Sequence, residues 1–585
     1  MYALVALLAL GLRLWRLDVF PLSSLEAGDA LVALDLSRGG LPGGGNYSPL
    51  MVSLGSFFFF LFDATEVTAR LGPALLGTGL VLLPLGLRRQ LGRVGALAAA
   101  ILLAFSPLAL YLSRTANGEI GVAAGGLAIV VGVLNWFEGA GQAAGSGDPN
   151  SSPAPLLPRT VAPLLAGLGL AIALTSGSLV YSLLIALGLA AGLTYLRARP
   201  GSRTRSVQDL WGAELQRAVI WGLAGFVVLS TSALFNLDGI AATSDLFSTW
   251  LSGFGRLEGQ IGGYPAILLL LFYEPLLVVS SLIGLSLVIL RRHRFGIFLI
   301  TWLVASLILD LAMAGRPQDA ALLPVLPLAL LGGLALDYLG RRLRAEGGWG
   351  REGLILGVGL VMNAFAYIEL TLWTRCVADT PNCSQAWLIP AVVEVAFLVL
   401  VLLFVVGYGF GVGLRGLSLT VLTLALLASL ASAWRLNYGP LRLLPYQPLV
   451  IRAPATGLLT LESVLADLSA ERVGDPTLLD VKVIGLDSPL VRWRLRDFSH
   501  LNPVAAAEAG TASPAEGNNA IAILAAPDIP FEALGIEGPY AGQDFMIEAS
   551  WRPAGLGPKL FIRWLLFREA PTMPAGERVV LWVRQ

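Results

Sequence analysis

The chain has 585 residues, of which 56% are hydrophobic and only 13% are charged, and its mean hydropathy is +0.75. These values lie far outside the range of soluble globular proteins, so composition alone predicts a polytopic membrane protein. The formal net charge is zero and long basic runs are absent from the sequence. Nucleic acid is therefore excluded as a partner, because that affinity requires clustered Lys and Arg.

Apolar segments of about 20 residues, each long enough to cross about 30 Å of hydrocarbon, follow one another along the chain. We expect about thirteen spans, at 1–17, 67–87, 94–112, 118–137, 160–176, 178–196, 217–235, 263–290, 295–314, 320–339, 352–373, 387–413 and 416–435. The first has no basic n-region and no following small-residue cleavage site, so we expect it to be retained rather than removed as a signal peptide. The run SPLMVSLGSFFFFLF (Ser48–Phe62) is short, and we predict an interfacial helix there.

The basic loops set the orientation. With this set of spans the arginines in RRQLGR, RARPGSRTR, RRHR and RRLRAEGGWGR all fall on one face, which the positive-inside rule makes cytoplasmic. The predicted protein is a multi-pass protein of the plasma membrane with a cytoplasmic N-terminus. Its outer loops are 18–66, 236–262, 315–319 and 374–386, and the Gly-, Ser- and Pro-rich stretch 139–158 is a flexible cytoplasmic loop.

The character of the sequence changes near residue 437, where apolar runs shorten and Pro and Asp become frequent. DVKVIGL (480–486) and AIAILAA (520–526) have the pattern of buried strands, and ERVVLWVRQ that of a closing strand. TLESVLADLSAERVG has helical spacing, and 514–519 is predicted as an exposed loop. The sequence therefore predicts two domains: an all-α transmembrane domain at 1–436, with outer-face loop and interfacial helices at 18–66, and an extracytoplasmic α/β domain at 437–585.

The two cysteines, Cys376 and Cys383, fall in one predicted outer loop. An oxidising compartment favours a disulfide between them over two free thiols. The two histidines, His293 and His500, fall on opposite sides of the membrane, which argues against a His-based triad or a His-rich metal site.

Charged residues gather at the predicted outer ends of the spans. Arg13 and Arg16 lie there against the positive-inside rule, and Glu26 and Asp29 follow at a helical i, i+3 spacing. Such groups either pair with one another or bind a charged ligand. A solvated helix paired to the two arginines and a site for a phosphate-bearing lipid both fit the pattern. Glu274 lies nearer mid-membrane and is predicted to be a hydrogen-bonded interior carboxyl.

Several motifs, taken in order, resemble the membrane glycosyltransferases of the C-shaped fold, in particular the group that includes protein O-mannosyltransferases and lipid A aminoarabinose transferase (glycosyltransferase family 39). LRLWRLDVFPLSSLEA is similar to the first span and loop of that family, and LAFSPLALYLSRTANGE is similar to its Ser-Arg stretch with an acid five residues on. NYSPLMVSLGSFFFFLF, followed by TEVTARLGPALLGTGLVLLPLGLRRQLGR, resembles its interfacial helix and second span. GRPQDAALLPVLPLALLGGLAL resembles its late outer loop, and SPLVRWRLRDF a bacterial and archaeal subgroup.

The resemblance implies about thirteen spans and transfer of a sugar from a polyprenyl-phosphate donor to an acceptor hydroxyl on the outer face. It places the catalytic base at Leu25, where the family has an aspartate, so Glu26 would take over that role, with Asp29 as the second candidate. The predicted substrate-binding residues are Arg70, Arg114, Glu119 and Arg316. The alternative is that these arginines pair with Glu119, Glu66 or Asp319 to satisfy local structure.

Two further readings stay open beside the enzyme. Because Leu25 replaces the family's acid, the chain can be a non-catalytic member of the fold that serves as a scaffold or a membrane-complex subunit. A transporter fits less well, because repeated broken helices do not stand out in the sequence. The predicted partners are the lipid bilayer, the lipid-linked donor and an acceptor whose identity the residues do not specify. They specify no cofactor either, and a divalent metal is left open.

Overall fold

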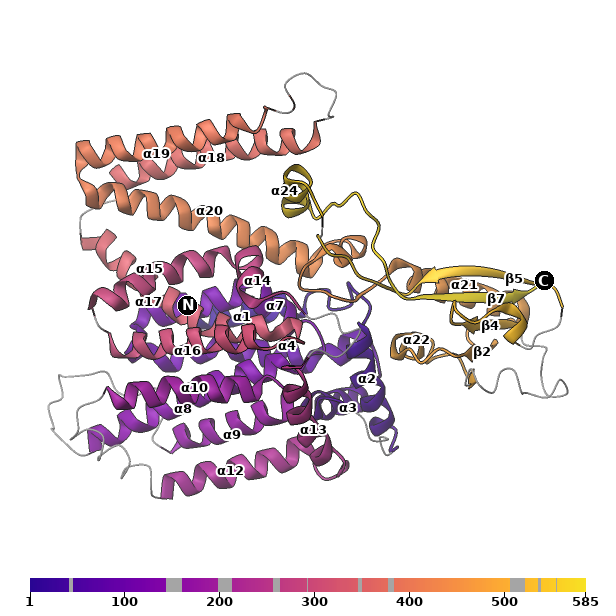
Figure 1. The fold of residues 1–585 in the computed structure, drawn as a ribbon. Helices are drawn as coiled ribbons and strands as arrows, with labels where there is room; N and C mark the ends of the chain where they lie inside the picture. Colours follow the sequence, from indigo (N-terminus) through magenta and orange to yellow (C-terminus); the bar gives the residue numbers. More distant parts are fainter. Residues whose placement is uncertain are drawn as a thin grey trace.

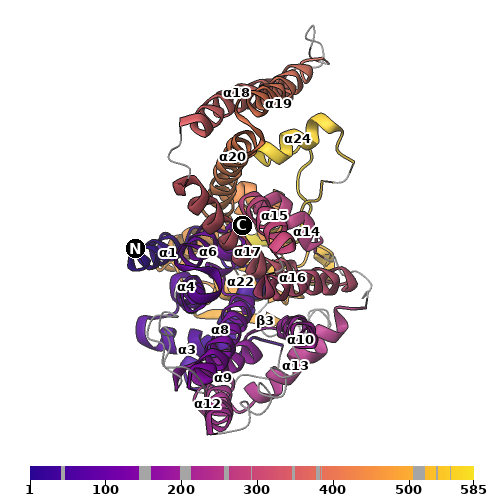
Figure 2. The same ribbon diagram turned by 90° about the vertical axis from the view of Figure 1, so that its left-hand side faces the viewer.

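A computed structural model describes residues 1–585 except 41–45, 144–159, 198–212, 256–262, 292, 346–349, 377–382, 384, 505–520, 535–537 and 554. Long helices lie roughly side by side and form one elongated bundle, seen from the side in Figure 1 and end-on in Figure 2. A small domain with strands projects from one end of the bundle, at the right of Figure 1. We call this end the domain-bearing end. The predicted loops 139–158 and 514–519 lie largely or wholly outside the described residues.

The helices of the bundle are α1 (Tyr2–Leu14), α4 (Glu66–Leu82), η1 (Leu83–Leu87), α5 (Arg88–Leu91), α6 (Arg93–Phe105), α7 (Pro107–Ser113), α8 (Glu119–Ala143), α9 (Val161–Ser176), α10 (Val180–Leu196), α12 (Ala213–Ser230), α14 (Ala266–Tyr273), α15 (Pro275–Arg291), α16 (Arg294–Ala312), η2 (Gln318–Ala321), α17 (Leu322–Ala345), α18 (Gly350–Arg375), α19 (Leu388–Tyr408) and α20 (Phe410–Tyr438). Each of the thirteen predicted spans coincides with one of these helices or with a bent pair. Within the described residues, seven helices are long and apolar enough to cross a membrane, and two bent pairs raise the number to nine. The chain is a multi-pass membrane protein, as predicted, and thirteen crossings stay a prediction.

Two spans are broken, and one buried carboxyl joins the two breaks. The axis bends by 61° between α6 and α7, at Ser106-Pro107, and by 107° between α14 and α15, at Glu274-Pro275. Proline has no backbone N–H and cannot make the usual hydrogen bond within a helix. Each break therefore leaves backbone N–H and C=O groups that need other partners. Glu274 Oε1 accepts hydrogen bonds from Ser106 Oγ (2.5 Å) and from the backbone N–H of Leu108 (2.9 Å). The interior carboxyl is thus hydrogen-bonded, as the sequence predicted, and it ties one broken span to the other.

Three helices lie at the domain-bearing end: α2 (Ser24–Ser37), α3 (Pro49–Phe62) and α13 (Gly239–Ser252) (Figure 1). Helix α2 begins with a capping box, in which Ser23 Oγ accepts from the Glu26 N–H while the Glu26 carboxylate accepts from the Ser23 N–H. Helix α3 corresponds to the predicted interfacial helix. The capping box fixes the direction in which α2 leaves the loop after α1.

The C-terminal domain is an α/β unit. It contains η3 (Leu441–Tyr446), β1 (Ala453–Pro454), α21 (Thr456–Val473), β2 (Asp480–Ile484), α22 (Pro489–Arg494), β3 (His500–Val504), β4 (Ala522–Ala525), η4 (Phe531–Leu534), β5 (Tyr540–Met546), β6 (Glu548–Ala549), α24 (Pro558–Phe567) and β7 (Arg578–Arg584). The five-stranded sheet has the order β3-β2-β4-β7-β5, with β3, β2 and β4 parallel and β7 antiparallel to both neighbours. The predicted strands and helix of this region are confirmed, and so is the predicted fold class.

Helix α22 holds the C-terminal domain against the helices of the domain-bearing end. Trp493 is 1% exposed and its ring stacks on Phe59 of α3 at a centroid distance of 5.8 Å. Arg494 pairs with Glu66 at the start of α4, and Arg496 Nη2 donates to the Ala64 carbonyl at 3.0 Å. These residues belong to the SPLVRWRLRDF segment, so that motif makes the joint between the domain and the bundle.

Cys376 and Cys383 form a disulfide after α18, with their Cα atoms 6.0 Å apart. The Lys559 ammonium on α24 donates to the Cys376 carbonyl at 2.6 Å and lies 3.3 Å from Cys383 Sγ. The C-terminal domain therefore also contacts the bundle beside this disulfide.

Candidate active-site cavity

A cavity of about 940 Å³ opens at the domain-bearing end. Its walls come from the loop after α1, from α2 and α4, from the α7–α8 and α9–α10 connections, from η2 and from the segment that leads into β1. Among its lining residues are Glu26, Asp29, Arg70, Arg114 and Glu119. The structure thus brings five of the predicted site residues into one cavity, although they are up to 93 positions apart in the sequence. Arg316 is not among the lining residues.

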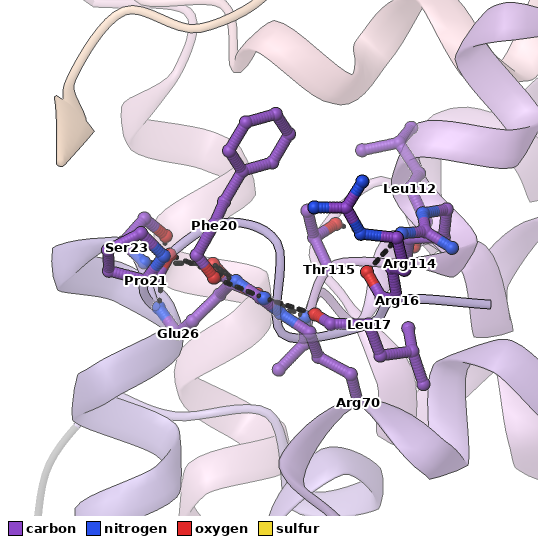
Figure 3. A network of polar contacts seen from close by, with 11 residues as sticks. Arg16, Leu17, Phe20, Pro21, Ser23, Glu26, Arg70, Leu112, Arg114 and Thr115 are labelled. Atoms are coloured by element: carbon purple, nitrogen blue, oxygen red, sulfur yellow. Dashed lines mark hydrogen bonds and ion pairs between the residues drawn. The ribbon is translucent and has the colours of Figure 1, made fainter. Parts of the chain in front are cut away.

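The Glu26 carboxylate is fully engaged by neighbouring donors (Figure 3). Its Oε1 accepts from Arg70 Nε at 2.9 Å and from the Ala116 N–H at 2.7 Å, and its Oε2 accepts from the Ser23 N–H at 2.8 Å and from Arg70 Nη2 at 3.0 Å. Burial alone would raise the pKa of Glu26, but the charge and hydrogen bonds of Arg70, together with the N–H groups of Ser23 and Ala116, outweigh it and lower the pKa. A carboxylate with this many donors is a poor proton acceptor. The geometry therefore favours a structural role for Glu26, which links α2 to Arg70 and to the α7–α8 connection.

Arg70 is the partner of Glu26 and also organises the loop after α1. Its Nη1 donates to the carbonyls of Leu17 (2.8 Å) and Phe20 (2.7 Å), and its Nη2 donates to that of Pro21 (3.1 Å). With the two bonds to Glu26, all five N–H groups of the guanidinium are used. The sequence left open an ion pair between Arg70 and Glu66. In the structure Arg70 pairs with Glu26, and Glu66 pairs with Arg494 of the C-terminal domain.

Arg114 caps the end of α1. Its Nη1 donates to the carbonyls of Leu12, Arg13 and Trp15 at 2.9, 3.1 and 2.7 Å. Its Nη2 donates to that of Arg16 at 2.7 Å, the contact that Figure 3 shows. The last carbonyls of a helix lack partners within the helix, and a guanidinium satisfies several of them at once.

Arg316 makes a related cap at the end of α16. Its Nε and Nη2 lie 3.2 and 3.4 Å from the carbonyl oxygens of Asp310 and Leu311. The alternatives in which Arg114 pairs with Glu119 and Arg316 with Asp319 are therefore not what the structure has. Arg70, Arg114 and Arg316, the three arginines predicted to bind substrate, all donate to backbone carbonyls.

Asp29 differs from Glu26 although it lies only one turn away on α2. Its side chain is partly exposed at the cavity, and its one hydrogen bond within the described residues comes from the Ser48 N–H at 3.4 Å. Burial raises the pKa of Asp29 to about 7, the Ser48 N–H partly offsets this, and the nearby Glu26 charge adds to it. A carboxylate with a pKa near neutrality and little hydrogen bonding is suited to accept a proton.

Leu25, at the position of the family's acid, is 82% exposed and lines the same cavity. Leu25 and Asp29 are four residues apart on α2 and therefore share a helix face. The helix thus presents an apolar side chain where the resemblance expects an acid, and a carboxylate one turn further on.

Asn117, Glu548 and Arg452 also line the cavity, and no sequence motif had indicated a role for them. Asn117 Nδ2 donates to Asp319 Oδ2, which links the α7–α8 connection to η2. Glu548 and Arg452 come from the C-terminal domain and from the segment before β1. Their only sequence signal is that they follow the last apolar span, which does not indicate proximity to residues near the N-terminus. Among the described residues, no group of three His, Cys, Asp or Glu side chains could hold a metal ion.

This arrangement of helices is similar to the fold of two solved structures of ArnT from Cupriavidus metallidurans. The structure bound to undecaprenyl phosphate superposes with a TM-score of 0.52 at 15% sequence identity, and the apo structure with 0.53 at 17%. Each match covers 99% of this chain and 97% of the other. No protein-family model and no curated protein matches the sequence. The fold expected from the sequence resemblance is therefore confirmed.

Proposed function

We propose that this protein is an integral-membrane glycosyltransferase that moves a sugar from a polyprenyl-phosphate donor to an acceptor hydroxyl. The observation that carries the proposal is the cavity at the domain-bearing end, in which the Asp29 carboxylate is available for chemistry. A structure of the same fold, ArnT, was solved with undecaprenyl phosphate bound, which supports a lipid phosphate as ligand. The cavity is lined by residues of α2 and of the segment before β1, and Figure 1 shows α2 at the end of the bundle from which the C-terminal domain projects. We place this end on the outer face, with the N-terminus cytoplasmic.

In this scheme Asp29 is the catalytic base. The acceptor oxygen forms a bond to the anomeric carbon of the sugar while its proton passes to the Asp29 carboxylate. The bond between that carbon and the phosphate oxygen breaks, and the electron pair leaves with the polyprenyl phosphate. Glu26 and Arg70 hold the α2 helix and the loop after α1 in place through their ion pair and their bonds to the loop backbone, and the Glu26 carboxylate is too fully bonded to take the proton.

The test compares two aspartates of the same helix. Asp29 lines the cavity, whereas Asp35 on α2 is exposed and lies outside it. Asp29→Asn should lower turnover by about 100-fold or more, and Asp35→Asn should leave it unchanged. The assay measures release of polyprenyl phosphate from a panel of polyprenyl-phosphate sugars by the protein in proteoliposomes, with a membrane extract as the source of acceptor. Equal turnover in wild type and Asp29→Asn would remove Asp29 from the mechanism.

The pH profile adds an independent readout. Because the pKa of Asp29 is raised to about 7, the basic form is lost as pH falls through that value. Turnover should therefore rise tenfold per pH unit below about 7 and level off above it. A profile that is flat between pH 5 and 8 would contradict the assignment.

A non-catalytic scaffold is the second candidate, and a specific observation favours it. Leu25 replaces the family's acid, and Arg70 and Arg114 are engaged by carbonyl oxygens rather than free in the cavity. The scaffold reading predicts that the wild-type protein neither turns over a donor from the panel nor binds undecaprenyl phosphate in preference to undecaprenol. Turnover that depends on Asp29 would exclude it.

A further inference from the structure

A leaving phosphate needs a cation, and the cavity offers few. Among the described residues that line it, three carry a positive charge: Arg70, Arg114 and Arg452. The guanidinium groups of Arg70 and Arg114 are occupied by Glu26 and by seven backbone carbonyls between them. Arg70 has no N–H group left for a phosphate unless those bonds break, and Arg114 holds the end of α1 through Nη1 and Nη2, which leaves only its Nε–H and one Nη2–H. Of the three, Arg452 is the one whose guanidinium is not tied to backbone carbonyls in the described part of the chain, so it is the cation most available to a phosphate.

Arg452 meets this requirement. Its side chain is exposed at the cavity, and within the described part of the chain no acid lies within 4.0 Å of its guanidinium. Glu548 is near enough to sense it: burial raises the pKa of Glu548, and the charge of Arg452 partly offsets that rise. An arginine with free donors can bind phosphate oxygens in a bidentate manner.

The backbone around Arg452 is held on both sides. The Ile451 N–H donates to Gln318 Oε1 of η2 at 2.9 Å, which fixes this segment to the bundle. Ala453 is fully buried and pairs with Ala549 in the β1–β6 ribbon, which fixes it to the C-terminal domain. Arg452 therefore lines the cavity from a backbone that is positioned by both parts of the molecule, so a ligand has to order only its side chain.

We propose that Arg452 binds the phosphate of the lipid-linked donor, so that the junction with the C-terminal domain completes the substrate site. This inference rests on the proposed function, because it assigns a residue to that donor. It also gives the C-terminal domain a role in the chemistry: the domain holds Arg452 against the bundle through the β1–β6 ribbon.

The test measures binding of undecaprenyl phosphate and of undecaprenol, which lacks the phosphate, to the full-length protein in nanodiscs. Wild type should prefer the phosphate form, and Arg452→Gln should lose about tenfold or more of that preference. Arg452→Lys should retain an intermediate preference, because it keeps the charge but loses the planar fork. Arg442→Gln is the matched control, since Arg442 is exposed in η3, ten residues earlier, and does not line the cavity.

The outcomes separate this inference from the proposed function. Unchanged preference in Arg452→Gln, or an equal loss in Arg442→Gln, would overturn the role of Arg452 while leaving a phosphate-binding wild type in place. A wild type that does not distinguish undecaprenyl phosphate from undecaprenol would instead overturn the proposed function itself. A loss confined to Arg452→Gln supports the inference.

Discussion

Substituting Glu26, the buried partner of Arg70, distinguishes a structural role of its carboxylate from a catalytic one. Glu26→Gln keeps one oxygen that accepts two hydrogen bonds, but it turns an NH₂ group toward the two donors at Oε2, the Ser23 N–H and Arg70 Nη2. Two charge-assisted hydrogen bonds are lost, at about 1.5–3 kcal/mol each. Removing one partner of a buried ion pair costs about 3–5 kcal/mol, which agrees with that sum. We therefore expect Glu26→Gln to destabilise the protein by about 3–5 kcal/mol.

The assay is thermal unfolding of the purified protein in detergent, followed by tryptophan fluorescence. Glu26→Gln should lower the apparent melting temperature by about 5 °C or more, while Asp35→Asn, on the exposed part of the same helix, should not change it. The double variant Glu26→Gln/Arg70→Gln should be less destabilised than the sum of the two single variants, by about 1–3 kcal/mol, because each single change leaves its partner unpaired. If Glu26→Gln melts like wild type but loses turnover, the carboxylate is the base and the structural role is wrong.

Two further predictions follow from the arrangement of the chain in the membrane. A cysteine introduced at position 513 should be modified by an impermeant reagent in sealed cells and one at position 202 should not, because the C-terminal domain is assigned to the outer face; the reverse pattern would overturn the orientation. Cys376 and Cys383 should resist thiol alkylation until reductant is added, which a gel shift measures, and Cys376→Ser should loosen only the loop after α18, because closure of a loop this short adds little stability. Alkylation of both thiols without reductant in oxidised material would refute the disulfide.

The fold followed from the sequence because a membrane imposes local rules. A span needs about 20 apolar residues in one run, so each helix of the bundle can be found from its own composition. The breaks at Ser106-Pro107 and Glu274-Pro275 were not foreseen as bends, because each falls inside a continuous apolar run. The strands of the C-terminal domain were found for the same local reason, since each is a short apolar run between turn residues.

The site was harder to foresee, because its contacts are long-range and use backbone acceptors. The sequence placed Glu26, Asp29, Arg70 and Arg114 correctly in one region, since the resemblance orders the motifs that carry them. The roles of the two arginines depend on carbonyl oxygens of α1 and of the loop after it, and every residue has a carbonyl, so no sequence pattern indicates which ones an arginine will cap. Arg452 was missed for another reason: its backbone is positioned by the bond from Ile451 to Gln318 and by the pairing of β1 with β6, both contacts between segments far apart in the sequence.

The position of the base can be tested by moving it. Leu25 and Asp29 lie on the same face of α2 and both line the cavity, and one helical turn, about 6 Å, separates them along the axis. If the mechanism requires a carboxylate on this face, then Leu25→Asp introduced into Asp29→Asn should recover part of the lost turnover, about tenfold over Asp29→Asn alone. Leu25→Asn in the same background is the control, because it matches the polarity and size of the new side chain without its basic oxygen. Leu25 is 82% exposed, so neither change should alter the melting temperature. Recovery with Leu25→Asp and none with Leu25→Asn would show that α2 carries the base and that this chain holds it one turn beyond the family's position. Equal recovery in both, or activity in Asp29→Asn equal to wild type, would show that no carboxylate on this helix face takes the acceptor proton.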